Sequence, residues 1–292
     1  MKRVLLVLAA SFLSSCSFSQ AKDSLLVFDW NLENFFDFKG YVGDRRWTSR
    51  RFYLKAEGIA KTVFSVSDRV GRLPDLLTFQ EVGERSVLSG LSGGTQLRKA
   101  GYGIVHFDSP DPRGIDCGLL YRKDALKLAC ARACHVYDSA GAVMKTRDLL
   151  LAEFENGSGR RVAAVVCHLP SKLRKDASER RKTAFARVIQ VCDSVYCDGL
   201  TPVFAVGDFN QAMEWMDTTE TKGSLKYNGV WERIDGVAAG RGVRSKERVF
   251  DAPFLLERDS AHGGLKPRRT FSGPRYLGGI SDHLPVVVEL WY

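Results

Sequence analysis

Runs of apolar, often β-branched residues recur along the chain and predict a sheet-rich core. The clearest is 201–206, which contains a proline near its start and is closed by Gly207, as expected of a buried strand that ends at a sheet edge. Similar runs predict further strands at 25–32, 75–80, 102–107, 118–121, 127–136, 148–154, 161–167, 233–238 and 286–290. Because the middle runs follow one another closely with turn residues between them, we expect antiparallel hairpins there.

Helical periodicity separates some of these strands. Apolar residues recur every three or four positions over 51–66 and over 178–197, which predicts two amphipathic helices that cover sheet faces. Residues 85–100 form a poorer helix because three glycines interrupt them, so we expect part of this segment to be loop. The region from 239 to 279 is basic and irregular. The pattern alone predicts an α/β protein with mixed sheets.

Polar side chains stand at the ends of two of the predicted strands. Asp208 and Asn210 follow the clearest strand two residues apart, so both can point the same way while Phe209 turns back to the core. Asp282 and His283 precede the last strand. Gly, Asp and Asn are also ordinary turn residues. A histidine that acts as a general base needs a carboxylate to fix its tautomer, so the two strand ends predict a shared site.

Five short motifs resemble, in their order, those of the endonuclease/exonuclease/phosphatase superfamily, which includes deoxyribonuclease I-like nucleases. The motifs are Trp30-Asn31-Leu32-Glu33-Asn34, Phe79-Gln80-Glu81-Val82, Cys167-His168-Leu169-Pro170-Ser171, Gly207-Asp208-Phe209-Asn210 and Ser281-Asp282-His283-Leu284-Pro285. The resemblance covers residues 25–292. It implies one domain with a four-layered α/β sandwich, in which two packed mixed or antiparallel sheets carry helices on the outside.

The resemblance also implies a hydrolase of phosphoester bonds that depends on Mg²⁺, or on Mn²⁺ in its place. Such hydrolysis requires charge neutralisation at the phosphoryl oxygens, an activated water and a stabilised leaving group. The carboxylate of Glu81 is the expected metal ligand, with the amide of Asn31 beside it, because hard cations prefer such oxygens. Asp282 is expected in the same shell or at a second ion.

The remaining motif residues are implied to carry the chemistry. His168 would contact the scissile phosphate, and Asn210 would donate to the phosphoryl oxygens. Asp208 would position or deprotonate the attacking water. His283 would act as general base or polarise the phosphate, oriented by Asp235. Which of Asp208 and His283 takes the proton stays open, and Gly236 follows Asp235 where the family commonly has a larger residue.

Net charge bears on the substrate. The 292-residue chain is 45% hydrophobic and 26% charged, with a net charge of +9, which favours polyanionic ligands without selecting one. Arg147 opens a predicted strand and is a candidate for direct phosphate contact. Basic clusters at 172–182 and 266–275 flank the motifs in sequence. They would attract a phosphate backbone if they surround the site, and are otherwise simply solvated.

The N-terminus has the pattern of an export signal. Lys2 and Arg3 precede an apolar stretch too short to span a bilayer, and Leu13-Ser14-Ser15-Cys16 resembles a bacterial lipobox. We expect a lipoprotein signal peptide at 1–15 and a lipidated tether at 16–24. The alternative is a secretory peptide cut near Ala21. Lipid on Cys16 would place a monomer at the bacterial cell envelope, on the outer membrane, in the periplasm or at the cell surface.

Six cysteines remain after this segment. Cys130 with Cys134, and Cys192 with Cys197, are close enough in sequence for disulfides in an exported chain. The other two lie in or beside strand-like runs and are expected to be buried small hydrophobes: Cys117 and Cys167.

These features favour an exported, metal-dependent nuclease that hydrolyses nucleic-acid phosphodiester bonds. The alternative is a phosphatase or phosphodiesterase for inositol phosphates, phosphoinositides or sphingomyelin-like lipid head groups, because membership of a family does not select the substrate. A catalytically inactive binding module at the envelope is a third hypothesis. The presence of every polar residue that the chemistry requires argues against it.

Overall fold

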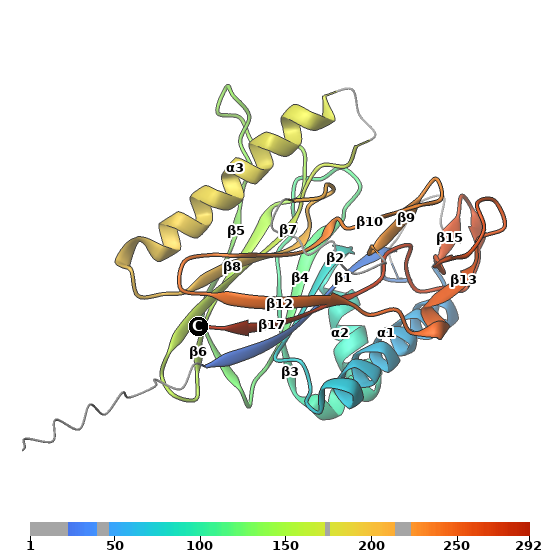
Figure 1. The fold of residues 1–292 in the computed structure, drawn as a ribbon, viewed down its shortest axis with the longest axis horizontal. Helices are drawn as coiled ribbons and strands as arrows, with labels where there is room; N and C mark the ends of the chain where they lie inside the picture. The colour runs from blue at the N-terminus through green and yellow to red at the C-terminus, as the bar shows by residue number, and fades with distance from the viewer. Residues whose placement is uncertain (1–22, 40–46, 173–175, 214–222) are drawn as a thin grey trace, which may run out of the picture.

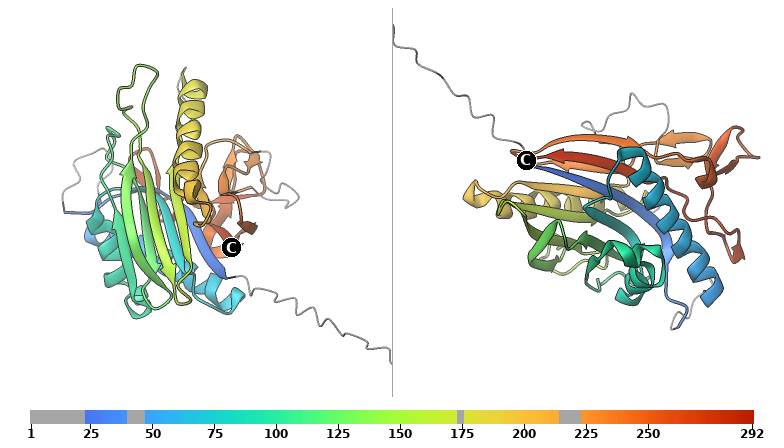
Figure 2. Two further views of the ribbon diagram at one scale, coloured as in Figure 1. Left: turned by 90° about the vertical axis from the view of Figure 1, so that its left-hand side faces the viewer. Right: turned by 90° about the horizontal axis from the view of Figure 1, so that it is seen from below.

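Two sheets packed face to face form the centre of the computed structural model (Figure 1), which describes residues 23–39, 47–172, 176–213 and 223–292. The predicted signal peptide and all but the end of the predicted tether lie outside these residues. Helices α1 and α2 lie on one side of the paired sheets and α3 on the other (Figures 1 and 2). The predicted four-layered α/β sandwich is confirmed.

Most neighbouring strands in the described part of the two sheets are antiparallel; the β1–β2 and β7–β8 pairs are parallel. The first sheet has the order β12 (Arg244–Val249), β17 (Val286–Trp291), β1 (Ser24–Phe35), β2 (Leu76–Val82), β4 (Asp116–Arg122), β3 (Tyr102–His106). The second has the order β11 (Asp235–Ala239), β8 (Val203–Asp208), β7 (Arg161–His168), β6 (Leu149–Asn156), β5 (Leu126–Cys134). The expected antiparallel pairs β3–β4, β5–β6 and β6–β7 are present, whereas β4 and β5 belong to different sheets and do not pair.

Helices and short hairpins complete the structure. The helices are α1 (Ser49–Val70), α2 (Arg85–Gly94) and α3 (Ala177–Val195), with single turns at Gln96–Ala100, Tyr196–Asp198 and Pro253–Leu255. Short strands pair as β9 (Leu225–Tyr227) with β10 (Val230–Glu232), β13 (Leu256–Arg258) with β14 (Leu265–Pro267), and β15 (Phe271–Ser272) with β16 (Arg275–Tyr276). Within the described ranges, no helix is both long and apolar enough to cross a membrane.

Side-chain alternation along the strands divides the core into three apolar layers. In β1, Phe28 and Trp30 pack toward α1 and α2, whereas Leu25 and Val27 pack between the two sheets. A third layer joins the second sheet to α3. Because successive side chains of a strand point to opposite faces, one strand serves two layers.

The segment 85–100, predicted as a poor helix that is partly loop, forms helix α2 only as far as Gly94, but the helix includes all three glycines. A β-carbon at Gly90 would lie 2.7 Å from the ring of Phe52, and one at Gly94 would lie 2.8 Å from the ring of Tyr53. These glycines therefore allow α1 and α2 to approach closely, which outweighs the cost of glycine in a helix.

Strand β12 lies in the region that was expected to be irregular. Its sequence RSKERV carries charged residues along most of its length, and it forms the edge of the first sheet against β17. Edge strands commonly carry charges because these prevent pairing with other chains. Because these charges replace the apolar residues that indicate a strand, β12 is not recognisable from the sequence.

All cysteines within the described residues are free thiols. The close pairs Cys130 with Cys134 and Cys192 with Cys197 are therefore not joined here. Cys117 and Cys167 are buried, as expected of small hydrophobes.

Candidate active site

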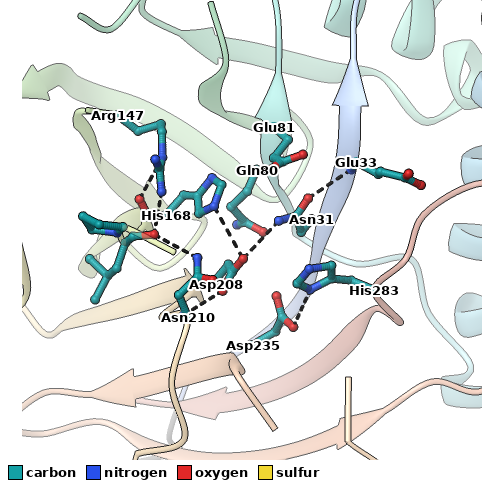
Figure 3. A network of polar contacts seen from close by, with 12 residues as sticks. Asn31, Glu33, Gln80, Glu81, Arg147, His168, Asp208, Asn210, Asp235 and His283 are labelled. Carbon is teal, nitrogen blue, oxygen red and sulfur yellow. Dashed lines mark hydrogen bonds and ion pairs between the residues drawn. The ribbon is translucent and has the colours of Figure 1, made fainter. Parts of the chain in front are cut away.

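The predicted site residues come together at one edge of the two sheets, where β1, β2, β7 and β8 end and β11 and β17 begin (Figure 3). Strand register explains part of this meeting. His168 pairs with Asp208 across the parallel β7–β8 ladder, and Asp208 pairs with Asp235 across the antiparallel β8–β11 ladder. Three motifs distant in sequence are thus neighbours in one sheet.

The backbone at these strand ends is unusual. β1 and β2 both shift register near their ends, and four residues there and after β8 have positive φ: Glu33 (46°), Asn34 (49°), Glu81 (59°) and Asn210 (53°). Such conformations are costly for residues other than glycine, and they persist where the surrounding structure imposes them. Bulges of this kind redirect side chains out of the regular alternation. The strand ends are therefore shaped to present particular side chains.

Asp235 and His283 form a buried pair. Nδ1 of His283 lies 2.9 Å from Oδ2 of Asp235, and the hydroxyl of Ser224 donates to the same oxygen. The main chain of His283 is also fixed, because its N–H donates to Ser281 Oγ (3.0 Å) and its carbonyl accepts from Trp30 Nε1 (2.9 Å). The predicted orienting role of Asp235 thus has the geometry it requires.

The charge state of His283 follows from this pair. Burial by itself lowers the pKa of His283, but the charge of Asp235 and the hydrogen bond to it raise that pKa well above its ordinary value. An imidazolium ion at this position donates from both ring nitrogens. With Nδ1 engaged by Asp235, Nε2 remains to donate to a substrate oxygen.

Asp208 lies at the centre of the polar residues in Figure 3. Its Oδ1 accepts from the main-chain N–H of Asn210 (2.7 Å), and its Oδ2 accepts from Asn31 Nδ2 (3.0 Å). Burial and the nearby charge of Asp235 raise the pKa of Asp208 to about 7. A carboxylate in this range both loses and accepts a proton readily near neutral pH.

His168 faces Asp208, with its Nε2 3.5 Å from Asp208 Oδ2. Burial lowers the pKa of His168 well below its ordinary value, and the charges of Arg147 and Arg113 lower it further. The surroundings therefore act in opposite directions on the two histidines of the site, since they lower the pKa of His168 and raise the pKa of His283.

Arg147 is a buried residue that supports the end of β7. Its Nε donates to the carbonyl of His168 (3.1 Å), its Nη2 to the carbonyl of Leu169, and its Nη1 to Asp111 (3.2 Å). Only 6% of its side chain is exposed. Nδ2 of Asn210 also donates to the Leu169 carbonyl (2.8 Å), so the two residues hold the same turn. These contacts describe positioning residues, and direct phosphate contact by Arg147 or Asn210 stays a prediction.

Replacing Arg147 by lysine tests this positioning role. Lysine keeps the charge but cannot reproduce the three-way hydrogen bonding, so His168 is expected to shift. We expect kcat to fall about ten- to a hundredfold with KM nearly unchanged, as measured by steady-state kinetics on a phosphodiester substrate. Arg132→Lys on the neighbouring strand, where the arginine is 48% exposed, serves as control. A rise in KM at constant kcat would instead show that Arg147 contacts the phosphate.

Of the predicted metal ligands, Asn31 contacts Asp208, and Glu81 lies near the end of the neighbouring strand β2. Glu81 is partly buried and accepts from the N–H of Asn34 (2.8 Å). Asn31 accepts from the N–H of Glu33 (3.0 Å) through Oδ1, while its Nδ2 reaches Asp208. The amide of Asn31 therefore links the end of β1 to Asp208.

Asp282 is paired with a cation. Its carboxylate lies 2.8 Å from Arg269 Nη2, and Arg269 Nε donates to Glu33 (3.1 Å). Glu33 also accepts from the N–H of Thr270. Arg269 thus holds the C-terminal motif against the end of β1. Glu33 belongs to the first motif but carries no predicted role, and only its place in that motif signals its importance.

Two groups in the described part of the chain each bring three potential ligand atoms within 4.8 Å of one another: Asp208, Asp235 and His283, and His106, Asp108 and Asp116. In the first, His283 already uses Nδ1 on Asp235, which is the arrangement of a catalytic pair. The carboxylate of Glu81 and the amide of Asn31 instead form the hard oxygen set that suits Mg²⁺. Asp235 Oδ1 and His168 Nδ1 are buried and have no hydrogen-bond partner among the described residues. These two atoms are available to a bound ligand, and the oxygens of Glu81 and Asn31 are of the kind that a divalent cation takes.

Arg113 and Asp29 are further residues of this region that the motifs do not indicate. Arg113 contacts Asp111 at 3.2 Å and lies 3.9 Å from Glu81 Oε1. Asp29 is fully buried below the site and accepts from Thr78 and Gln80. Arg113 was not predicted because it lies between β3 and β4, far in sequence from any motif. Asp29 was not predicted because it is a single polar residue within an apolar strand.

Comparison with known proteins bears on the family and the fold of the chain. The chain matches the model of a family described as the Endonuclease/Exonuclease/phosphatase family over residues 30–218 and 208–291. No curated protein matches. Among solved structures, humanized D. rerio TDP2 is 15% identical in sequence to this chain. The match covers 91% of this chain and 98% of the TDP2 chain, with a TM-score of 0.60.

Two further structures share the fold. The human Nocturnin catalytic domain, solved with a bound sulfate anion, is 16% identical, with 93% of this chain and 98% of that chain covered and a TM-score of 0.59. An endonuclease/exonuclease/phosphatase family protein from Bacteroides thetaiotaomicron is 17% identical, with 93% and 98% covered and a TM-score of 0.61.

Proposed function

Since the chain belongs to the Endonuclease/Exonuclease/phosphatase family and is therefore a phosphoester hydrolase, we propose that it hydrolyses nucleic-acid phosphodiester bonds with the help of Mg²⁺. The observation that carries the proposal is the meeting of Asp208 with the Asp235–His283 pair, beside Glu81 and Asn31 (Figure 3). This arrangement brings a proton acceptor, a cationic hydrogen-bond donor and a set of metal ligands together at one buried edge of the two sheets.

In the proposed reaction, Asp208 takes the proton of the attacking water. Its two oxygens are held by the N–H of Asn210 and the amide of Asn31, so the carboxylate has a fixed orientation. A general base in the correct orientation contributes roughly 10²- to 10⁴-fold to a rate. The raised pKa of Asp208, about 7, suits this role.

His283 has a second role in the proposed reaction. Held through Nδ1 by Asp235, its imidazolium directs Nε2 to a phosphoryl oxygen and stabilises the negative charge that develops there. His168, whose own carbonyl accepts from Arg147 Nε, adds a second hydrogen bond to the phosphate. Glu81 and Asn31 would hold Mg²⁺, and the bound ion supplies further charge neutralisation.

The substrate class is tested by incubating the purified protein with supercoiled plasmid, RNA, inositol phosphates and sphingomyelin, with Mg²⁺ or with a chelator. We expect nicking of plasmid or cleavage of RNA that the chelator abolishes and added Mg²⁺ restores. Asp208→Ala is the matched inactive control. Release of phosphate or phosphocholine with intact nucleic acid would move the protein to the alternative substrate class. Cleavage that continues in chelator would contradict the role of the metal.

A further inference from the structure

A pocket of about 240 Å³ opens beside the candidate active site. It lies between the β3–β4 loop, the segment before β6, the turn after β7 and the start of α3. Its lining includes Asp111, Arg113, Lys145, Arg147, Ser171 and Arg180.

The pocket shares two residues with the site. Arg147 lines it and donates to the carbonyl of His168, so the pocket wall and the reacting edge are joined by one side chain. Arg113 lines it from the other side and lies 3.9 Å from Glu81 Oε1. A group bound in the pocket would therefore lie next to the phosphate that is cleaved.

The pocket is strongly basic. Four basic side chains line it against one carboxylate, and this carboxylate, Asp111, is shared at 3.2 Å by Arg113 and by Arg147. Lys145 is exposed, and Arg180 donates to the Lys145 carbonyl (3.1 Å), which places its guanidinium at the pocket. Ala177, the first residue of α3, adds the positive end of a helix dipole.

We propose that this pocket binds a second phosphate of the substrate, next to the phosphate that is cleaved. The inference rests on the proposed function and refines it. It favours substrates with two or more phosphates, such as a nucleic-acid backbone or a polyphosphorylated inositol, over those with one, such as sphingomyelin. Guanidinium and ammonium groups recognise phosphate by charge-assisted hydrogen bonds, and the pocket offers several of them together.

The test compares a substrate that fills the pocket with one that does not. Lys145→Gln and Arg180→Gln are combined, because neither residue contacts the groups assigned to catalysis. Lys123→Gln with Lys127→Gln removes the same charge at exposed positions outside the pocket and serves as control. Supercoiled plasmid supplies neighbouring phosphates, whereas bis(p-nitrophenyl) phosphate carries only one.

We expect the pocket double variant to lose about tenfold in kcat/KM on plasmid and to change by less than about twofold on the single phosphodiester. The control double variant should change by less than about twofold on both. Equal losses on both substrates, or equal plasmid losses in the two double variants, would overturn the proposal. If the wild-type protein leaves plasmid and RNA intact, the proposed function fails separately. Inositol hexakisphosphate then replaces plasmid, and an undiminished rate in the pocket variant would overturn the second-phosphate site.

Discussion

Asp208→Asn is expected to lower kcat/KM by about a thousandfold on a phosphodiester substrate. The asparagine keeps the size of the side chain and can still accept from the N–H of Asn210, but it cannot take a proton from water. Initial rates of plasmid nicking in Mg²⁺ measure the loss. Asp193→Asn on the exposed side of α3 makes the same chemical change away from the site and should leave the rate unaltered. More than a tenth of the wild-type rate in the Asp208 variant would exclude this carboxylate as the proton acceptor.

The same substitution has an expected signature in stability. Burial and the charge of Asp235 raise the pKa of Asp208 from 3.8 to about 7, so the folded protein binds this proton more tightly than the unfolded chain does. The stabilisation that comes from binding this proton is fully present below pH 3.8. It is lost as the pH rises to about 7. Without metal, the wild-type protein should therefore lose stability relative to Asp208→Asn over this range. Urea unfolding in chelator at several pH values measures the difference, and a constant difference would contradict the raised pKa.

Gly207→Ala is expected to destabilise the fold by about 4 kcal/mol, because overpacking and backbone strain act together. A β-carbon at this position would lie 2.0 Å from the carbonyl oxygen of Cys167 and 3.1 Å from Gln80 Nε2. Gly207 also has a φ of 142°, which other residues rarely adopt. The Cys167 carbonyl belongs to β7, the parallel neighbour of β8, so relief would require separating the strands that carry His168 and Asp208.

Urea unfolding with Gly157→Ala as control checks this expectation. Gly157 has open space where a β-carbon would be added, so its substitution should change the free energy of unfolding by less than about 0.5 kcal/mol. If the two variants were equally stable, the close approach at Gly207 would not be a constraint. The glycine of the Gly-Asp-Phe-Asn motif would then be explained by its turn alone.

The position of the site was predictable from the sequence because strand ends are local features. An apolar run followed by polar residues indicates where a strand stops, and this placed Asp208 and His283 at sheet edges. Parallel pairing then brings the ends of β7 and β8 together, as the register of His168 with Asp208 confirms. Phe209 is buried, as expected from the alternation.

Long-range partners were not predictable, because they depend on how distant segments meet. Arg269 joins Glu33, which lies 236 residues away, to Asp282, and no local pattern signals that contact. Arg147 opens a strand in the sequence, yet the fold turns its guanidinium toward the carbonyls that follow β7. Strand β12 was missed, and the segment of α2 was predicted only as a poor helix, for a related reason. Glycines and charges weaken a local signal even where tertiary contacts require the element.

The position of β17 has a consequence for how the chain reaches this structure. β17 pairs with β1 on one side and with β12 on the other, so the edge of β1 has no strand partner until residues 286–291 are present. Pairing of such distant segments makes folding slow, since a long loop must close before the contacts stabilise it. A growing chain therefore exposes an apolar strand edge for most of its synthesis, which is a known risk for aggregation. The last strand both completes the sheet and delivers His283, so catalytic competence and protection of that edge arise in the same step.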